Sequence, residues 1–154
     1  MPIYLKIDGI DGEVTAAGFE KTIEVLSFSW GVTQSSSRGT GGGGGAGKAS
    51  FQDIHFVQST QSSSPLLLKA VATGQHIKNV LMTFIKGESN KGGGFLKIKL
   101  EDVLVSSYQA GGAEGSNTDT PSEEVSLNFA KIEFDYTAPD GTEIDFAFDV
   151  LANQ

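Results

Sequence analysis

The sequence predicts a mainly β fold, a barrel or a sandwich of antiparallel sheets with one short helix packed on it. Two observations carry this prediction: apolar and polar residues alternate along most of the chain, and one segment, residues 64–74, carries helix signals instead. With 154 residues the chain is most simply one domain. A domain of that size buries roughly 70% of its unfolded surface, so its core needs no disulfide, and the chain has no cysteine.

Three strands are expected in the first part of the chain. Residues 3–7 alternate between apolar and polar side chains. Residues 23–32 alternate too, but the phase changes at Val25–Leu26, which predicts a β-bulge there. The apolar side chains within residues 51–56 indicate the third strand.

The segment SPLLLKAVATG predicts a short helix over about residues 65–73. Ser64 is its expected N-cap, Pro65 suits the first helical position, and Gly74 suits the residue just past the end. Because Lys69 is its one clearly polar residue, we expect this helix to be mostly buried.

Four strands are expected after the helix, at residues 80–84, 96–100, 125–136 and 144–150. The phase of the strand at 125–136 changes once along its length. The last strand alternates most regularly, and the turn sequence PDGT before it predicts a hairpin with its predecessor. The predicted core includes Phe28, Trp30, Leu67 and Val71.

The polar face of this C-terminal hairpin is expected at solvent or at an interface, without a catalytic role. Carboxylates on one face repel one another unless Lys97 and Lys99 lie opposite them, and exposed ion pairs contribute only ~0–1 kcal/mol each. The carboxylates are Glu133, Asp135, Glu143, Asp145 and Asp149.

The stretch GTGGGGGAGKAS, residues 39–50, contains most of a phosphate-binding loop, with G-x-x-x-x-G-K from Gly42 to Lys48. Such a loop continues with Ser or Thr and then a helix. Here Ala49 follows, and then the strand pattern FQDIHFVQ. We therefore predict no nucleotide and no other cofactor, and interpret residues 34–49 as a long glycine-rich loop that is either flexible or ordered by a partner. Residues 87–94 and 110–122 also lack periodicity and are predicted surface loops.

Metal and catalytic sites are not indicated. Asp53 and His55 share a strand face, but a metal needs three or four ligands and no third is apparent. His76 is expected to cap the end of the helix. The acidic stretches 8–13 and 140–143 lack the spacing of a calcium loop, and no G-x-S-x-G nucleophile elbow is present. The residues therefore favour binding or assembly.

Charge and aromatic placement exclude other classes. The chain has 11 Lys and Arg against 19 Asp and Glu, a net charge of -8 that would repel a nucleic acid. No apolar stretch approaches the ~18 residues that span a membrane, and the N-terminus does not resemble a secretory signal. A carbohydrate-binding sandwich usually exposes aromatic rings, whereas most of the 10 Phe fall on apolar strand faces.

Five motifs, in order, resemble the haemolysin-coregulated protein (Hcp) family, the tube proteins of bacterial type VI secretion systems. They are VLSFSWGVTQ, GTGGGGGAGKASFQDIHF, SSPLLLKAVATGQHI, LEDVLVSSYQAGG and EEVSLNFAKIEFDY. The resemblance extends from Ile3 to Asn153 and implies one domain over residues 1–154, a β-barrel of two packed antiparallel sheets with a helix at the side. Two departures, Gln61–Ser62 in place of Asp-Lys and Phe148 near an expected tryptophan, bear on which partners are accepted.

The resemblance also implies function. It implies homohexameric rings that stack into a tube, inside a contractile sheath and under a spike protein, with small effector proteins in the lumen. It implies no enzyme activity, assembly in the bacterial cytoplasm, and secretion without a cleaved signal peptide. We expect no fused effector domain, because the chain ends after the last strand.

The resemblance gives the glycine-rich loop an expected role in contacts between stacked rings. The segment from Gly39 to Ser50 has no large apolar side chain, so it contributes little to a core. The residues assigned to this stacking loop are Arg38, Gly39, Thr40, Gly41, Gly42, Gly43, Gly44, Gly45, Gly47 and Lys48.

Overall fold

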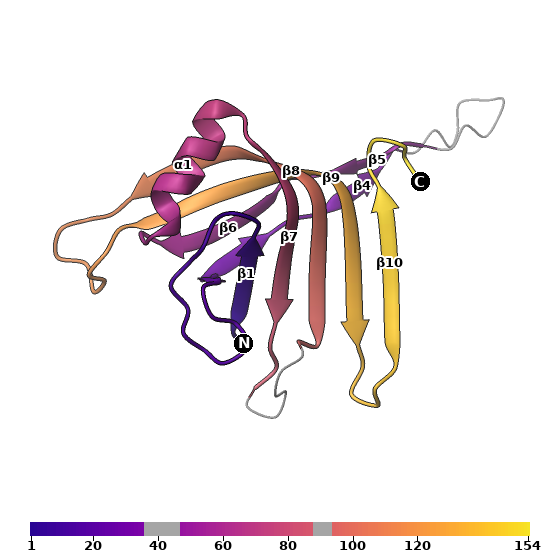
Figure 1. Cartoon of the computed structure of the whole chain (residues 1–154). Coiled ribbons are helices and arrows are strands. Elements are labelled where there is room, and N and C mark those ends of the chain that lie inside the picture. The colour runs from indigo at the N-terminus through magenta and orange to yellow at the C-terminus, as the bar shows by residue number, and fades with distance from the viewer. Residues whose placement is uncertain (36–46, 88–93) are drawn as a thin grey trace.

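The computed structural model describes residues 1–35, 47–87 and 94–154, and its elements are mostly strands (Figure 1). They are β1 Ile3–Ile7, β2 Ile23–Glu24, β3 Ser27–Ser29, β4 Val32–Gln34, β5 Ala49–Phe51, β6 Ile54–Ser59, α1 Ser63–Thr73, β7 His76–Phe84, β8 Leu96–Gly111, β9 Ser122–Thr137 and β10 Glu143–Asp149. The predicted class, mainly antiparallel β with one short helix, is confirmed. Among the described residues, no helix has the length and apolarity that a membrane crossing requires.

The main sheet has eight strands in the order β2-β1-β7-β8-β9-β6-β3, with β10 also paired to β9. The strands β8 and β9, of 16 residues each, run through the whole sheet. The first part of β9, residues 122–127, pairs with β6, and its last part, residues 131–137, pairs with β10. The long strands therefore belong to both halves of the sheet. In the described part of the chain, a second sheet contains β4 and β5 alone.

A crease crosses β7, β8 and β9 at one level. Each strand places two consecutive residues outside the core there: Lys78–Asn79, Glu101–Asp102 and Ala130–Lys131. These pairs are aligned across the strands, and Asp102 has a left-handed backbone with φ of 52°. The strands curve over at this level (Figure 1), so the two halves of the sheet pack face to face. The phase change predicted within residues 125–136 belongs to this bend.

The sheet closes at Val25 and Leu26. The Val25 amide donates to the Ile3 carbonyl of β1 at 2.9 Å, and the Leu26 amide donates to the Val57 carbonyl of β6 at 2.8 Å. One residue therefore joins one end of the sheet and the next residue joins the other end. The β-bulge predicted at Val25–Leu26 was wrong, because the phase changes where the chain exchanges one partner strand for another.

The helix begins and packs differently from the expectation. Ser62 holds the N-cap position but makes no side-chain cap, and its amide donates to Glu13 Oε2 at 2.7 Å. Ser64, the expected cap, lies inside the helix. Gly74 ends the helix with φ of 66°, as predicted. The prediction of a mostly buried helix was wrong, because only one face meets the sheet: Leu66 and Leu68 are 40% and 51% exposed.

The core fills the space between the two halves of the sheet. Leu67 is fully buried, whereas Phe28, Trp30 and Val71 are half-buried and pack against the core cluster. The apolar face of β10 is largely uncovered, with Phe146 63% exposed. This face is uncovered because β10 lies at the edge of the sheet, beyond the part that the opposite half of the sheet covers.

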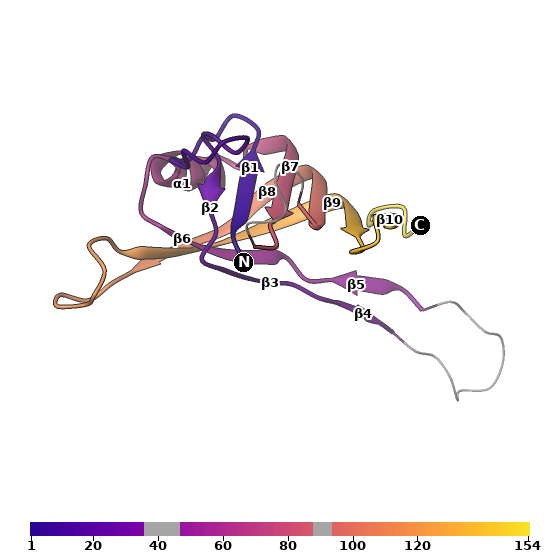
Figure 2. The same ribbon diagram turned by 90° about the horizontal axis from the view of Figure 1, so that it is seen from below.

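Two extensions leave the barrel on opposite sides. Figure 2 shows the ends of β8 and β9 on one side and the strands β4 and β5 on the other. We call residues 31–35 and 47–52, which contain β4 and β5, the arm. Its two strands pair only with each other among the described residues.

Candidate functional site

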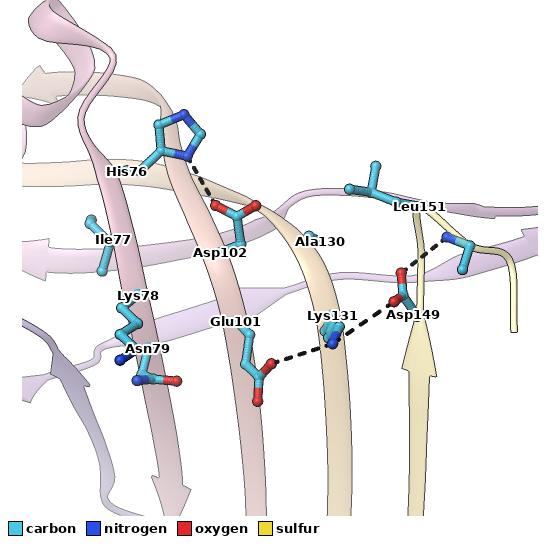
Figure 3. A pocket seen from close by; sticks show the side chains of 11 residues that line it. His76, Ile77, Lys78, Asn79, Glu101, Asp102, Ala130, Lys131, Asp149 and Leu151 are labelled. Atoms are coloured by element: carbon cyan, nitrogen blue, oxygen red, sulfur yellow. Dashed lines mark hydrogen bonds and ion pairs between the residues drawn. The ribbon is translucent and has the colours of Figure 1, made fainter.

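A groove of about 800 Å³ lies over the crease, between β7, β8, β9 and the chain after β10 (Figure 3). His76 Nδ1 lies 2.9 Å from Asp102 Oδ1. Lys131 Nζ lies 4.0 Å from Glu101 Oε2 and 3.9 Å from Asp149 Oδ2. The expectation that His76 caps the helix was wrong, since its ring faces Asp102 on β8.

The groove offers a polar, charged surface. Its ion pairs are solvent-exposed, and such pairs contribute only ~0–1 kcal/mol each. Neither His76 nor His55 contacts a nucleophilic side chain in the described ranges, where His55 pairs with Glu124 at 3.5 Å. The same ranges contain no group of three or more His, Cys, Asp or Glu placed to hold a metal ion.

A buried polar cluster lies beneath the start of α1, centred on Glu123 of β9. Glu123 is 2% exposed and Gln58 of β6 is fully buried. The Glu123 carboxylate accepts hydrogen bonds from Ser64 Oγ at 2.7 Å, from Gln58 Nε2 at 2.8 Å and from Thr60 Oγ1 at 2.8 Å. Ser63 Oγ donates to Gln58 Oε1 at 3.0 Å. The cluster therefore fixes the helix to two strands.

The electrostatics of this cluster follow from burial and hydrogen bonding. Burial alone would raise the pKa of Glu123, but hydrogen bonds from Tyr108, Gln58, Ser64 and Thr60 outweigh it and lower the pKa below its ordinary value. Burial, together with the Glu123 carboxylate, raises the pKa of Tyr108 to about 12. Glu123 is therefore a charged structural anchor that several donors satisfy.

Sequence reasoning missed this cluster, although a signal was available. Glu123 stands in phase with Val125 and Leu127, which are both fully buried on the same face of β9. A carboxylate at an inward position must be hydrogen-bonded to be tolerated. The serines at the start of the predicted helix were suitable donors.

Three carboxylates of the C-terminal hairpin, Glu133, Asp135 and Asp149, have lysine partners within the same chain. Lys99 Nζ lies 3.4 Å from Glu133 Oε2 and 3.5 Å from Asp135 Oδ2, and Glu133 raises the pKa of Lys99. Lys97 stands opposite Asp135 in the strand register. Glu143 and Asp145 are exposed, while Glu133, Asp135 and Asp149 are half-buried.

Of the stacking-loop residues, the structure describes only Gly47 and Lys48. Arg38, Gly39, Thr40, Gly41, Gly42, Gly43, Gly44 and Gly45 lie outside the described residues. The Lys48 amide donates to Ser35 Oγ at 3.0 Å, which joins the two sides of the arm. A Cβ on Gly47 would overlap the Ser35 carbonyl oxygen, so this close approach requires glycine.

A bent antiparallel barrel that leaves apolar strand surface exposed is suited to contacts with other chains. Residues 4–136 match the family model described as "Type VI secretion system effector, Hcp". The chain is 36% identical to Protein hcp1 of Pseudomonas aeruginosa over 157 residues, covering 98% of this chain and 96% of that protein. This chain belongs to the Hcp family of type VI secretion system proteins, and it is a structural component rather than an enzyme.

Solved structures agree with this membership. Hcp1 from Salmonella typhimurium superposes with a TM-score of 0.84 at 30% identity, over 99% of this chain and 97% of that one. A type VI secretion system effector from Yersinia pestis gives a TM-score of 0.80 at 31% identity, over 96% of this chain and 99% of that one. Both similarities therefore extend over nearly the full chain.

Proposed function

We propose that this chain forms homohexameric rings that stack into the inner tube of a type VI secretion system. In this proposal the tube is ejected into a target cell, carries effector proteins in its lumen, and contacts a sheath and a spike protein. The observation that carries the proposal is the uncovered apolar face of β10, which stands at the edge of the sheet. On that face Ile144 and Phe146 are 62% and 63% exposed.

Unpaired strand edges support assembly with further copies. In the described ranges β10 pairs on one side only, with β9. The sheet order ends at β3, so no described strand pairs with its outer edge. The pairing of β7 with β8 ends at Leu104, which leaves residues 105–111 of β8 with one partner strand, β9. Bare edges expose unsatisfied backbone groups that another chain can pair.

The positions of the apolar surfaces favour a ring over a two-fold dimer. The helix α1, which carries the exposed Leu66 and Leu68, lies on the opposite side of the barrel from β10 (Figure 2). When one patch of a chain meets a different patch on the next copy, the contact repeats head to tail and closes into a ring if the rotation permits. A ring of six copies is the arrangement that Hcp membership favours.

The glycine-rich loop is assigned to contacts between rings. The arm that carries it projects away from the barrel (Figure 2), and Lys48 directly precedes β5. Because Gln34 pairs with Ala49 at the base of the loop, residues 35–48 run out and back and can extend at most ~23 Å beyond that pair, at ~3.3 Å per residue. Arg38 and Lys48 would there meet acidic side chains of the facing ring.

Shortening the loop tests this function. Replacing Gly41 to Gly45 by a short turn should leave monomer stability and ring formation intact, because loop shortening costs little. It should weaken stacking, seen by electron microscopy, and abolish release of the protein into the medium by cells that carry the secretion system. Normal stacking and release would show that the loop is only a linker, and loss of rings would place it within the ring.

A further inference from the structure

We propose that Asp53 is a positioning residue that fixes the direction in which the arm leaves the barrel. Asp53 connects β5, the second strand of the arm, to β6 of the main sheet. Because β4 and β5 pair only with each other in the described part of the chain, contacts at the base must set the arm's direction. The proposed role in stacking rests on the function proposed above, whereas the contact itself does not.

One side of the arm base is held by aromatic packing. The ring of Phe51 lies 6.0 Å from that of Phe129 and 5.3 Å from that of Phe148, measured between centroids. The Gln52 amide donates to the Gly31 carbonyl at 2.9 Å, which joins the two chain segments where they leave the barrel. Hydrophobic packing is non-directional, so these contacts attach the base without by themselves fixing its orientation.

The opposite side is held by the Asp53 carboxylate. Ser106 Oγ of β8 donates to Asp53 Oδ2 at 2.6 Å, and Asn128 Nδ2 of β9 donates to Asp53 Oδ1 at 2.9 Å. Each oxygen is thus bonded to a different strand of the main sheet. Two bonds to two strands, opposed by the Phe51 packing, prevent the base from rocking.

A register shift in β8 presents Ser106 for this contact. The register of β8 against β9 shifts between Val105 and Ser107, so Ser106 and Ser107 both lie on the outer surface. A bulge re-aims side chains in this way. Without the extra residue, the alternation would not place two hydroxyls side by side on that surface.

Those hydroxyls form a directed chain that ends at Asp53. Ser106 Oγ lies 2.7 Å from Ser126 Oγ, and Ser126 Oγ is in turn bonded to Ser107 Oγ. A hydroxyl has one proton, and Ser106 donates its proton to the carboxylate, so Ser126 must donate to Ser106 and Ser107 to Ser126. Each bond polarises the next toward the carboxylate, which strengthens the contact.

The test measures arm direction separately from assembly. The chain has no cysteine, so cysteines placed at Thr33 on the arm and Lys78 on the barrel can carry spin labels. The distance distribution is measured by pulsed electron paramagnetic resonance in full-length chains, with labelled chains diluted into an excess of unlabelled chains. The variants are Asp53→Ala, Asn128→Ala and Asp53→Asn, and the matched control is Asp8→Ala, since Asp8 accepts a similar bond from Asn79.

The parent and Asp8→Ala should give one narrow distance distribution. Asp53→Ala and Asn128→Ala should give a broad distance distribution while their unfolding midpoint stays unchanged. Asp53→Asn should give a distribution of intermediate width, between those of the parent and Asp53→Ala, because one acceptor oxygen remains. A distribution in Asp53→Ala and Asn128→Ala as narrow as the parent's would overturn the proposal. A broad distribution with stacks of parental length would retain the positioning role and refute the arm's part in stacking.

Discussion

The Glu123 carboxylate accepts a hydrogen bond from Ser64 Oγ at 2.7 Å, across 59 residues of sequence. Through Ser64 the carboxylate holds the first turn of α1, and through Gln58 and Thr60 it holds β6 and the chain that follows it. Ser64 Oγ also accepts from the Gln61 amide at 2.9 Å. A carboxylate that is distant in sequence therefore organises the start of α1, where the N-cap residue Ser62 makes no side-chain cap.

Replacing Glu123 should therefore destabilise the barrel. Glu123→Ala removes the carboxylate acceptor of the buried Gln58 and Ser64 donors, and each such loss costs ~1–3 kcal/mol, so we expect a total of about 2–6 kcal/mol. Glu123→Gln keeps one acceptor oxygen and should cost roughly half as much. Urea unfolding measures both, and an alanine variant as stable as the parent would show that the cluster is dispensable.

Glu123 also predicts a pH dependence. Its folded pKa lies below the unfolded value of 4.5, so its contribution to stability is present above that value and is lost as pH falls through the folded pKa. Melting temperatures followed downward from neutral pH should thus fall more steeply below about pH 4.5 in the parent than in Glu123→Gln. Parallel curves for the two proteins would contradict this assignment.

Two neighbouring leucines of α1 give a matched test of its packing. Leu67 is fully buried and Leu68 is 51% exposed. Leu67→Ala should cost about 2–5 kcal/mol of unfolding free energy through the cavity it leaves, whereas Leu68→Ala should change it by no more than ~0.5 kcal/mol. Equal costs in denaturant titrations would mean that the helix buries a different face.

The apolar face of β10 should be required for assembly and not for folding. Phe146 is 63% exposed, so Phe146→Ser should change monomer stability by less than about 1 kcal/mol. It should nevertheless shift the native mass from ring to monomer. Ala147→Ser, on the opposite face of the same strand, should leave rings intact. Rings of normal mass in Phe146→Ser would exclude this face from the interface.

Much of the fold could be predicted from the sequence because alternation directly reports which residues face a core. The strands at residues 3–7 and 144–150 and the C-cap at Gly74 were predicted at or near their observed positions. Alternation does not report partners, however. In the sequence, a β-bulge and a change of partner strand would produce the same phase change at Val25–Leu26. Only the hydrogen bonds to Ile3 and Val57 distinguish these two structures.

The sites were harder to predict because they depend on contacts between distant residues. The Asp53 contact needs Ser106 and Asn128 from two other strands, and the β8 bulge that presents Ser106 leaves no clear sequence signal. The apolar pattern of β10 correctly indicated a strand. It did not reveal that the covering half of the barrel ends before Phe146, because that depends on where β8 and β9 bend.

The most direct test of the account is the native mass and outline of the purified full-length chain. Sedimentation at micromolar concentration, followed by electron microscopy of the same sample, measures both. We predict a species with the mass of six 16.2 kDa chains that appears as a ring with a central opening. A species of 16.2 kDa without rings would contradict the proposed tube function.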